Sequence, residues 1–178
     1  LQAMLVRLHR QAEKVGLNIS FEKTKVIGCC LPPLAVSIDG HVLECVPEFA
    51  YLGSLVGGSG SSSCEIANRI AKASRAFSGL DKRLWSRRSI SITTKLKVFE
   101  AAILPCATYG CETWAPKMSE ARQLDVFQRL CFRRMLGVSR RDRLPNAKIH
   151  SLCGNRALLS DIAKKKRLTW LGHVLRMS

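Results

Sequence analysis

The clearest helical pattern of apolar residues covers residues 62–84. Its apolar positions are three or four residues apart, which places them in one stripe along a helix; they are Ile66, Ile70, Ala73, Phe77, Leu80 and Leu84. Ser62 and Glu65 have the spacing of a capping box, in which the two side chains bond free amides at a helix start. The opposite side and one flank of this predicted helix are basic, with Lys72, Arg75, Lys82 and Arg83.

Two more helices are predicted after it. Over residues 93–104, Leu96, Phe99 and Ile103 fall on one side, and Pro105 should kink or end the run because proline lacks an amide hydrogen and clashes with the preceding turn. Residues 119–136 form the next pattern, which Gly137 should end. Its core stripe is Leu124, Phe127, Cys131 and Met135.

Arginines form a second basic group around that third helix. Arg122, Arg129 and Arg133 lie opposite its apolar stripe, and Arg140, Arg141 and Arg143 follow in the connecting loop. Beyond the loop we expect a short helix ending near Gly154 and a longer one over residues 160–177. The longer helix has an apolar stripe of Leu168, Leu171 and Leu175 that Trp170 and Val174 broaden. We expect Trp170 and Trp114 to be core anchors rather than stacking platforms for bases.

The N-terminal part mixes a helix with short strands. Met4, Leu5, Leu8, Ala12 and Val15 predict an amphipathic helix that Gly16 ends, and residues 17–21 alternate as a half-buried strand would. Residues 36–43 predict a hairpin around the two-residue turn Asp39-Gly40. Residues 49–56 are a further strand candidate, and residues 57–63, rich in Gly and Ser, a flexible linker.

These elements predict an α+β fold, with a β-hairpin and strand part first and a mainly α-helical bundle after it. We place the boundaries at residues 1–56, the linker 57–63, a helical domain over 64–137 and a basic helical extension over 138–178. The chain starts at Leu1 and stops at Ser178 within a pattern, so we interpret it as an excerpt of a longer protein.

Charge is distributed unevenly between these parts. The net charge is +16, and residues 1–64 contribute nothing to it because their Lys and Arg residues are matched by Asp and Glu. Such a field on one part of a small protein indicates a polyanionic partner, and nucleic acid fits better than an anionic membrane. No apolar run of about 18 residues and no signal-peptide pattern occurs.

No self-sufficient catalytic constellation is visible. The sequence contains no paired carboxylates, nucleophile elbow or phosphate-binding glycine loop. Its eight cysteines form no C-x-x-C pair, which favours buried reduced thiols. The alternative is a zinc site that draws on Cys131, His150, Cys153 or His173, whose spacing matches no standard ligand set.

Five stretches, in order, resemble the reverse transcriptases of non-LTR (LINE-type) retrotransposons. Residues 16–25 (GLNISFEKTK) resemble the end of the palm, and residues 49–54 (FAYLGS) the primer-grip strand. Glu65-Ile66, Arg69-Ile70 and Ala73 are similar to the opening helix of the thumb, and residues 109–114 (YGCETW) to its Tyr-Gly-x-Glu-x-Trp segment. Residues 167–177 (RLTWLGHVLRM) resemble a recurrent C-terminal string of these elements.

The resemblance implies roles in RNA-directed DNA synthesis. The aspartates that hold the catalytic Mg²⁺ ions would lie upstream of Leu1, so the fragment itself should hold no cofactor and should be inactive alone. Lys23 would stand where a lysine protonates the departing pyrophosphate, with Lys25 as a competitor and a solvated lysine as the plain alternative. Tyr51, Leu52 and Gly53 would hold the 3′ end of the primer, unless they only pack a hairpin on the palm.

The resemblance also assigns partners to the cations. Lys72, Arg75, Lys82 and Arg83 would contact the backbone of the RNA/DNA template–primer duplex. Arg122, Arg129, Arg133, Arg140 and Arg141 would hold template RNA or target DNA. Lys164, Lys165, Lys166 and Arg167 would bind nucleic acid or act as a nuclear localisation signal. The other expected partners are the element RNA and the missing fingers and palm, in a nuclear protein with a cytoplasmic ribonucleoprotein stage.

Two other functions fit the same residues. One is a free-standing basic module that binds nucleic acid without any polymerase, derived from such an element. The other is a helical scaffold that binds nothing and whose charge serves solubility. An Asp-Asp pair on a strand just upstream of Leu1 in the parent gene would favour the polymerase over both.

Overall fold

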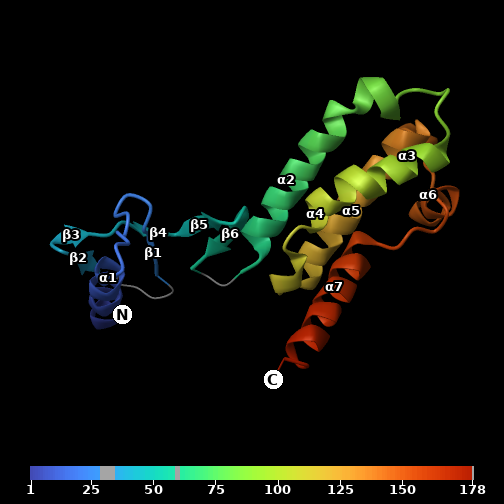
Figure 1. The fold of residues 1–178 in the computed structure, drawn as a ribbon. Helices are drawn as coiled ribbons and strands as arrows, with labels where there is room; N and C mark the ends of the chain where they lie inside the picture. The colour runs from blue at the N-terminus through green and yellow to red at the C-terminus, as the bar shows by residue number, and fades with distance from the viewer. Residues whose placement is uncertain (29–34, 59–60, 178) are drawn as a thin grey trace. The chain divides into compact units, whose positions relative to one another are not determined.

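The chain forms two compact units, residues 1–61 and 62–178, each described here by itself (Figure 1). The computed structural model describes residues 1–28, 35–58 and 61–177, apart from the side chain of Arg140. Cys29, Cys30 and the Pro32-Pro33 pair lie outside these residues. The fold is mixed α and β, and the described residues contain seven α-helices and six short strands. The two units meet within the Gly- and Ser-rich stretch 57–63.

The first unit is built on helix α1 and a hairpin. Helix α1 (Gln2–Lys14) is followed by Gly16 at φ +76°, in the left-handed region that favours glycine. Strands β2 (Ser37–Ile38) and β3 (His41–Val42) are antiparallel around Asp39 and Gly40, which both have positive φ, as the predicted hairpin requires. Strands β1 (Val26–Ile27) and β4 (Cys45–Val46) pair in parallel.

The predicted strand at residues 17–21 is wrong. No strand forms there, because the backbone of this segment has no neighbouring strand to pair with among the described residues. Its alternation still has a physical basis. Ile19 and Phe21 are half-buried against the small cluster of Val36, Ile38 and Leu43.

Residues 48–57 form a hairpin where a single strand was predicted. Strands β5 (Glu48–Tyr51) and β6 (Ser54–Gly57) are antiparallel, with Tyr51 opposite Ser54. Leu52 and Gly53 make the turn at φ +48° and +81°. Two positive φ values in succession suit a two-residue hairpin turn, and glycine is the residue that adopts one without strain.

The second unit opens with the predicted long helix. Helix α2 (Ser63–Gly79) continues into a π-helical segment, η1 (Asp81–Trp85). The Ser62 part of the predicted capping box does not form, since the Ser62 side chain makes no capping hydrogen bond. Its Oγ instead accepts a hydrogen bond from the N–H of Ala115 at 2.8 Å, which ties the start of α2 to a distant part of the chain.

The proline at position 105 sits inside a helical run rather than at its end. Helix α3 (Ile92–Val98) passes through the π-helical segment η2 (Phe99–Ile103) into α4 (Leu104–Thr108). Pro105 offers no amide hydrogen, and its ring would meet a carbonyl of the preceding α-helical turn. The wider π turn directly before α4 accommodates it, in line with the predicted disturbance at this proline.

Three helices complete the unit after η3 (Cys111–Thr113). Helix α5 (Met118–Leu136) ends at Gly137 with φ +69°, as predicted, and η4 (Arg140–Asp142) leads to α6 (Asn146–Leu152). Helix α7 (Leu159–Val174) packs on α5, α4 and η3. Glu120 accepts the N–H of Lys117 at 2.8 Å and the hydroxyl hydrogen of Ser63, so it joins the starts of α5 and α2 and has a lowered pKa.

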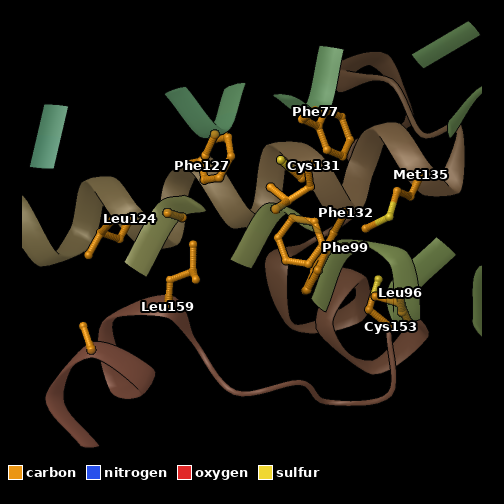
Figure 2. Close-up of a cluster of buried hydrophobic side chains, with 14 of the residues drawn as sticks. Phe77, Leu96, Phe99, Leu124, Phe127, Cys131, Phe132, Met135, Cys153 and Leu159 are labelled. Carbon is orange, nitrogen blue, oxygen red and sulfur yellow. The ribbon is translucent and has the colours of Figure 1, made fainter. Parts of the chain in front are cut away.

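The core of this unit is aromatic and sulfur-rich (Figure 2). Phe77 stacks on Trp85 with ring centroids 4.6 Å apart, and Phe99 meets Phe132 edge-on at 5.6 Å. The predicted core stripe of α5 is buried throughout. Burial raises the pKa of the Cys131 thiol to about 12, and the six described cysteines, Cys45, Cys64, Cys106, Cys111, Cys131 and Cys153, are all free thiols.

Helix α7 differs from its prediction along half of its length. Leu159 and Ala163, in its first turns, are buried in the core. The predicted stripe farther along is exposed instead, and its members are Leu168, Leu171 and Leu175 with Trp170 and Val174. The prediction of Trp170 as a core anchor is therefore wrong, whereas Trp114 is buried as predicted.

Candidate nucleic-acid interface

The strongest candidate surface is the cationic face of α2 and η1. Arg75, Lys82 and Arg83 are exposed, and none has an acidic partner in the described part of the chain. Lys72 is half-buried and takes part in contacts within the protein. Three unneutralised cations on one continuous helical rod form a surface that attracts an anion.

A buried ion pair fixes the inner side of α2. Arg69 Nε donates to Glu65 Oε1 at 2.6 Å, one helical turn apart, and both side chains are buried. The Arg69 guanidinium also lies over the Tyr109 ring, 4.4 Å from its centroid. Glu65, Arg69 and Tyr109 all belong to stretches that carry the family resemblance. Here they hold α2 in place and leave its other face to solvent.

A second set of contacts fixes η1, which carries Lys82 and Arg83. Trp85 Nε1 donates to the Phe77 carbonyl at 2.6 Å. Lys95 is buried, and its Nζ donates to the carbonyls of Trp85 at 2.8 Å and Met135 at 3.2 Å. These carbonyls end η1 and α5, where helix carbonyls lack partners and a cation is favoured.

An ion pair adds to this attachment. Arg134 Nε donates to Asp81 Oδ1 at 2.7 Å, and a second guanidinium N–H reaches Asp81 Oδ2. This two-point pairing lowers the pKa of the Asp81 carboxyl. Sequence reasoning overlooked both Lys95 and Arg134. The available signal was that Lys95 stands four residues before Phe99, which places it on the apolar side of the predicted helix.

The second predicted arginine group is not a uniform binding surface. Arg133 is half-buried and donates to the Leu144 carbonyl at 2.8 Å and to Asn146 Oδ1 at 3.0 Å. It therefore holds the loop between α5 and α6. Arg122 and Arg141 are exposed and Arg129 is half-buried. The side chain of Arg140 lies outside the described part of the structure.

The run of cations on α7 is also divided. Lys166 Nζ lies 3.2 Å from Thr108 Oγ1 and 3.9 Å from Glu112, so this lysine attaches α7 to α4 and η3. Lys164 and Lys165 are exposed and have no acidic partner in the described residues, and Arg167 is half-buried. On α7, the better candidates for contact with an external anion are therefore Lys164 and Lys165 rather than Lys166.

In the first unit the structure separates the two candidate lysines. Lys25 Nζ donates to Glu44 Oε2 at 2.5 Å, while Lys23 is exposed and has no acidic partner within the described residues. Tyr51 and Leu52 project from the β5–β6 hairpin with 63% and 76% of their surface exposed. Gly53 completes the turn. No active-site geometry around Lys23 follows from these positions.

One group of side chains has the spacing to hold a cation. Ligand atoms of His9, Glu13 and Asp39 lie within 4.8 Å of one another, and His9 is the buried member. His9 Nε2 is 2.6 Å from Asp39 Oδ2, a hydrogen bond that also joins α1 to the hairpin turn. The predicted alternative of a zinc site at Cys131, His150, Cys153 or His173 has no counterpart among the described residues.

The comparisons with known proteins identify no relative. No protein family, curated protein or solved structure was found to match the chain. Within the described residues, none of the helices has the length and apolar character needed to cross a membrane.

Proposed function

We propose that the helical unit binds the backbone of an RNA/DNA template–primer duplex through Arg75, Lys82 and Arg83. This is the task of the thumb in the LINE-type reverse transcriptases that the sequence resembles. The observation that carries the proposal is that three exposed cations, with no acidic partner among the described residues, stand on α2 and η1. The core and the Lys95 and Arg134 contacts hold these segments in place.

The spacing of these cations suits a nucleic acid backbone. Arg75 and Lys82 are seven residues apart, about 10 Å along a helix axis. That distance is comparable to the rise of about three successive phosphates on one strand. Contacts with phosphates fix register and add affinity without reading sequence, which suits a protein that must move along any duplex.

The exposed hairpin tip supports a second part of the proposal. Tyr51 and Leu52 project beyond the backbone pairing of β5 and β6, and Leu52 holds a positive φ that a leucine rarely adopts. We assign this tip to the 3′ end of the primer. Replacing Tyr51 by Ala should then weaken binding to a hybrid with a recessed 3′ end more than to a blunt hybrid.

For Lys23 the proposal is limited to a choice between two lysines. Lys25 is engaged by Glu44, so Lys23 is the better candidate for a proton donor to pyrophosphate. A lysine that donates a proton must be free to approach the leaving group. The proposal assigns no other chemical step to this chain.

The main test is a titration with a labelled RNA/DNA hybrid, with double-stranded DNA and single strands for comparison. Arg75→Glu, Lys82→Glu and Arg83→Glu combined should weaken hybrid binding by well over tenfold at moderate salt. The salt slope should become shallower by about three, since each phosphate contact contributes about 0.9. A preference of the unaltered protein for the hybrid separates the polymerase assignment from the free-standing basic module.

A matched control removes the effect of net charge. Arg7, Arg10 and Lys14 are exposed cations on α1, and their combined replacement by Glu changes the total charge equally. This control should leave hybrid binding within about twofold. Equal losses in both variants would show that only total charge matters, and the α2 surface would be rejected. No binding by the folded, unaltered protein would favour the scaffold.

A further inference from the structure

One tryptophan of the helical unit is exposed where the other two are buried. Trp85 and Trp114 are 1% and 3% exposed, whereas Trp170 on α7 is 50% exposed. Its ring lies beside that of His173, with centroids 5.5 Å apart and planes at 40°. An exposed indole next to an imidazole is an unusual surface, because large aromatic rings gain most from burial.

Two hollows lie along α7, and Trp170 borders both. The first has a volume of about 470 Å³ and is lined by Lys165, Lys166, Thr169, His173, Arg176 and Glu112 besides the tryptophan. The second, of about 460 Å³, includes Lys164, Arg167 and Leu171. The indole therefore stands between two depressions with cations at their edges.

Cations outnumber acidic residues around both hollows. Glu112 is the acidic residue that borders both, and Lys166 is its neighbour at 3.9 Å. Lys164, Lys165 and Arg176 have no acidic partner in the part of the chain that the structure describes. This excess of cations favours an anionic ligand.

A buried donor beside the second hollow is also left without an acceptor. Trp114 lines that hollow, and its Nε1–H is buried with no hydrogen-bond partner in the described part of the chain. A buried donor without an acceptor is destabilising, so its persistence next to a ligand-sized space needs a reason. An acceptor atom supplied from the hollow, reached by a small shift of the α7 side chains, would satisfy it.

We propose that this face of α7 binds single-stranded nucleic acid, with a base stacked on Trp170 and phosphates on Lys164, Lys165 and Arg176. Stacking on an aromatic ring combined with a basic groove is how proteins hold single strands without reading their sequence. The inference rests on the proposed function for the class of partner, but it concerns a different helix, a different set of cations and a strand outside the duplex.

The unpartnered apolar side chains beside Trp170 fit this ligand better than they fit a protein. Leu168, Leu171 and Val174 are exposed on the same helix and would cover the faces and sugars of neighbouring nucleotides. A protein partner would need to bring several carboxylates to meet the three cations. One phosphate for each nucleotide supplies that charge at regular spacing.

The test uses the intact chain and an oligothymidylate or oligouridylate of about 15 nucleotides, within the size of known single-strand sites. Trp170 is the exposed one of the three tryptophans, so a stacked base should quench a large part of the exposed tryptophan fluorescence. Trp170→Ala should weaken binding about tenfold, and Trp170→Phe should keep most of the affinity because a ring remains. Leu130→Ala, which removes an exposed apolar side chain of α5 away from both hollows, should change affinity less than threefold.

The variants on α2 and α7 separate the two proposals. Trp170→Ala should leave binding to the RNA/DNA hybrid unchanged, while the triple replacement of Arg75, Lys82 and Arg83 should weaken hybrid binding and spare the single strand. Unquenched fluorescence on saturation, or equal affinity of Trp170→Ala and the unaltered chain, would overturn the single-strand site. A Trp170→Ala variant that alters only self-association would overturn it too, and would identify a protein-docking surface.

Discussion

The two units of the chain differ in both charge and core. The first unit, residues 1–61, carries no net charge and buries three apolar residues among those described, Val36, Ile38 and Leu43. The second, residues 62–178, carries the whole net charge of +16 and has a buried cluster of nineteen residues. Repulsion between like charges opposes a compact state. The larger hydrophobic core of the second unit stabilises it against the repulsion between its cations and keeps those cations in fixed positions.

The strongest test of this difference is to divide the chain between the two units and study each piece separately. We expect residues 62–178 alone to give a helical spectrum and a single cooperative thermal transition, because their core lies within the cut piece. Residues 1–61 alone should show no cooperative transition, since a core as small as the one that the described residues of this unit form cannot offset the ordering of such a short chain. A cooperative transition in the short piece would contradict the comparison.

The next largest effect should come from a cavity in the second core. Phe132 is fully buried and packs edge-on against Phe99, so Phe132→Ala should lower the free energy of unfolding by about 3–5 kcal/mol. Phe21 is the matched residue of the first unit, half-buried beside the small cluster. Phe21→Ala should lower the free energy of unfolding by a smaller amount. Urea unfolding followed by circular dichroism measures both, and equal losses would remove the contrast between the cores.

The second unit was also the more predictable from its sequence. Helices α2 and α5 were found from their apolar stripes because each buries one face and exposes the other, so burial repeats with the period of the helix. The hairpin at Asp39-Gly40 was predicted because its two-residue turn needs two positive φ values, and Asp and Gly are residues that adopt them. The structure of these elements therefore depends mainly on residues that are close together in the sequence.

The wrong predictions concern segments whose structure depends on contacts between residues far apart in the sequence. Residues 17–21 alternate like a strand, but no neighbouring strand is there to pair with them among the described residues. The turn at Leu52-Gly53 was overlooked because a leucine at positive φ carries no turn signal. Arg133 and Lys166 looked like free cations, and only the folded chain brings Leu144 and Thr108 to them. Trp170 was wrongly predicted as a core anchor because periodicity shows that a face is apolar, not what covers it.

A smaller effect should come from the buried lysine that joins η1 to α5. Lys95→Met keeps the length of the side chain but leaves the carbonyls of Trp85 and Met135 without their donor. We expect a loss of about 1–3 kcal/mol in the free energy of unfolding. Lys97→Met, at an exposed position of the same helix, is the control and should stay within about 0.5 kcal/mol. A loss no larger than that of the control would show that Lys95 does not contribute to the stability of the second unit.

The smallest effect should come from the Asp81–Arg134 pair, and it should depend on pH. Hydrogen bonds from Arg134 lower the pKa of Asp81 below the value of about 3.9 that it has in an unfolded chain. A carboxyl with a lowered pKa adds stability above its unfolded pKa, and this stability is lost as the pH falls through the folded value. Because Arg134 is largely exposed, the gain should stay below about 1 kcal/mol.

The measurement compares Asp81→Asn with the unaltered chain at about pH 6 and again near pH 2. The variant should be less stable at the higher pH, and the gap should narrow toward pH 2 as the Asp81 carboxyl becomes protonated. A gap that persists at low pH would mean that packing, not the charge, attaches η1 to α5. In that case Lys82 and Arg83 would depend for their position on the core of the second unit and on the Lys95 hydrogen bonds, and the contrast between the two units would become sharper.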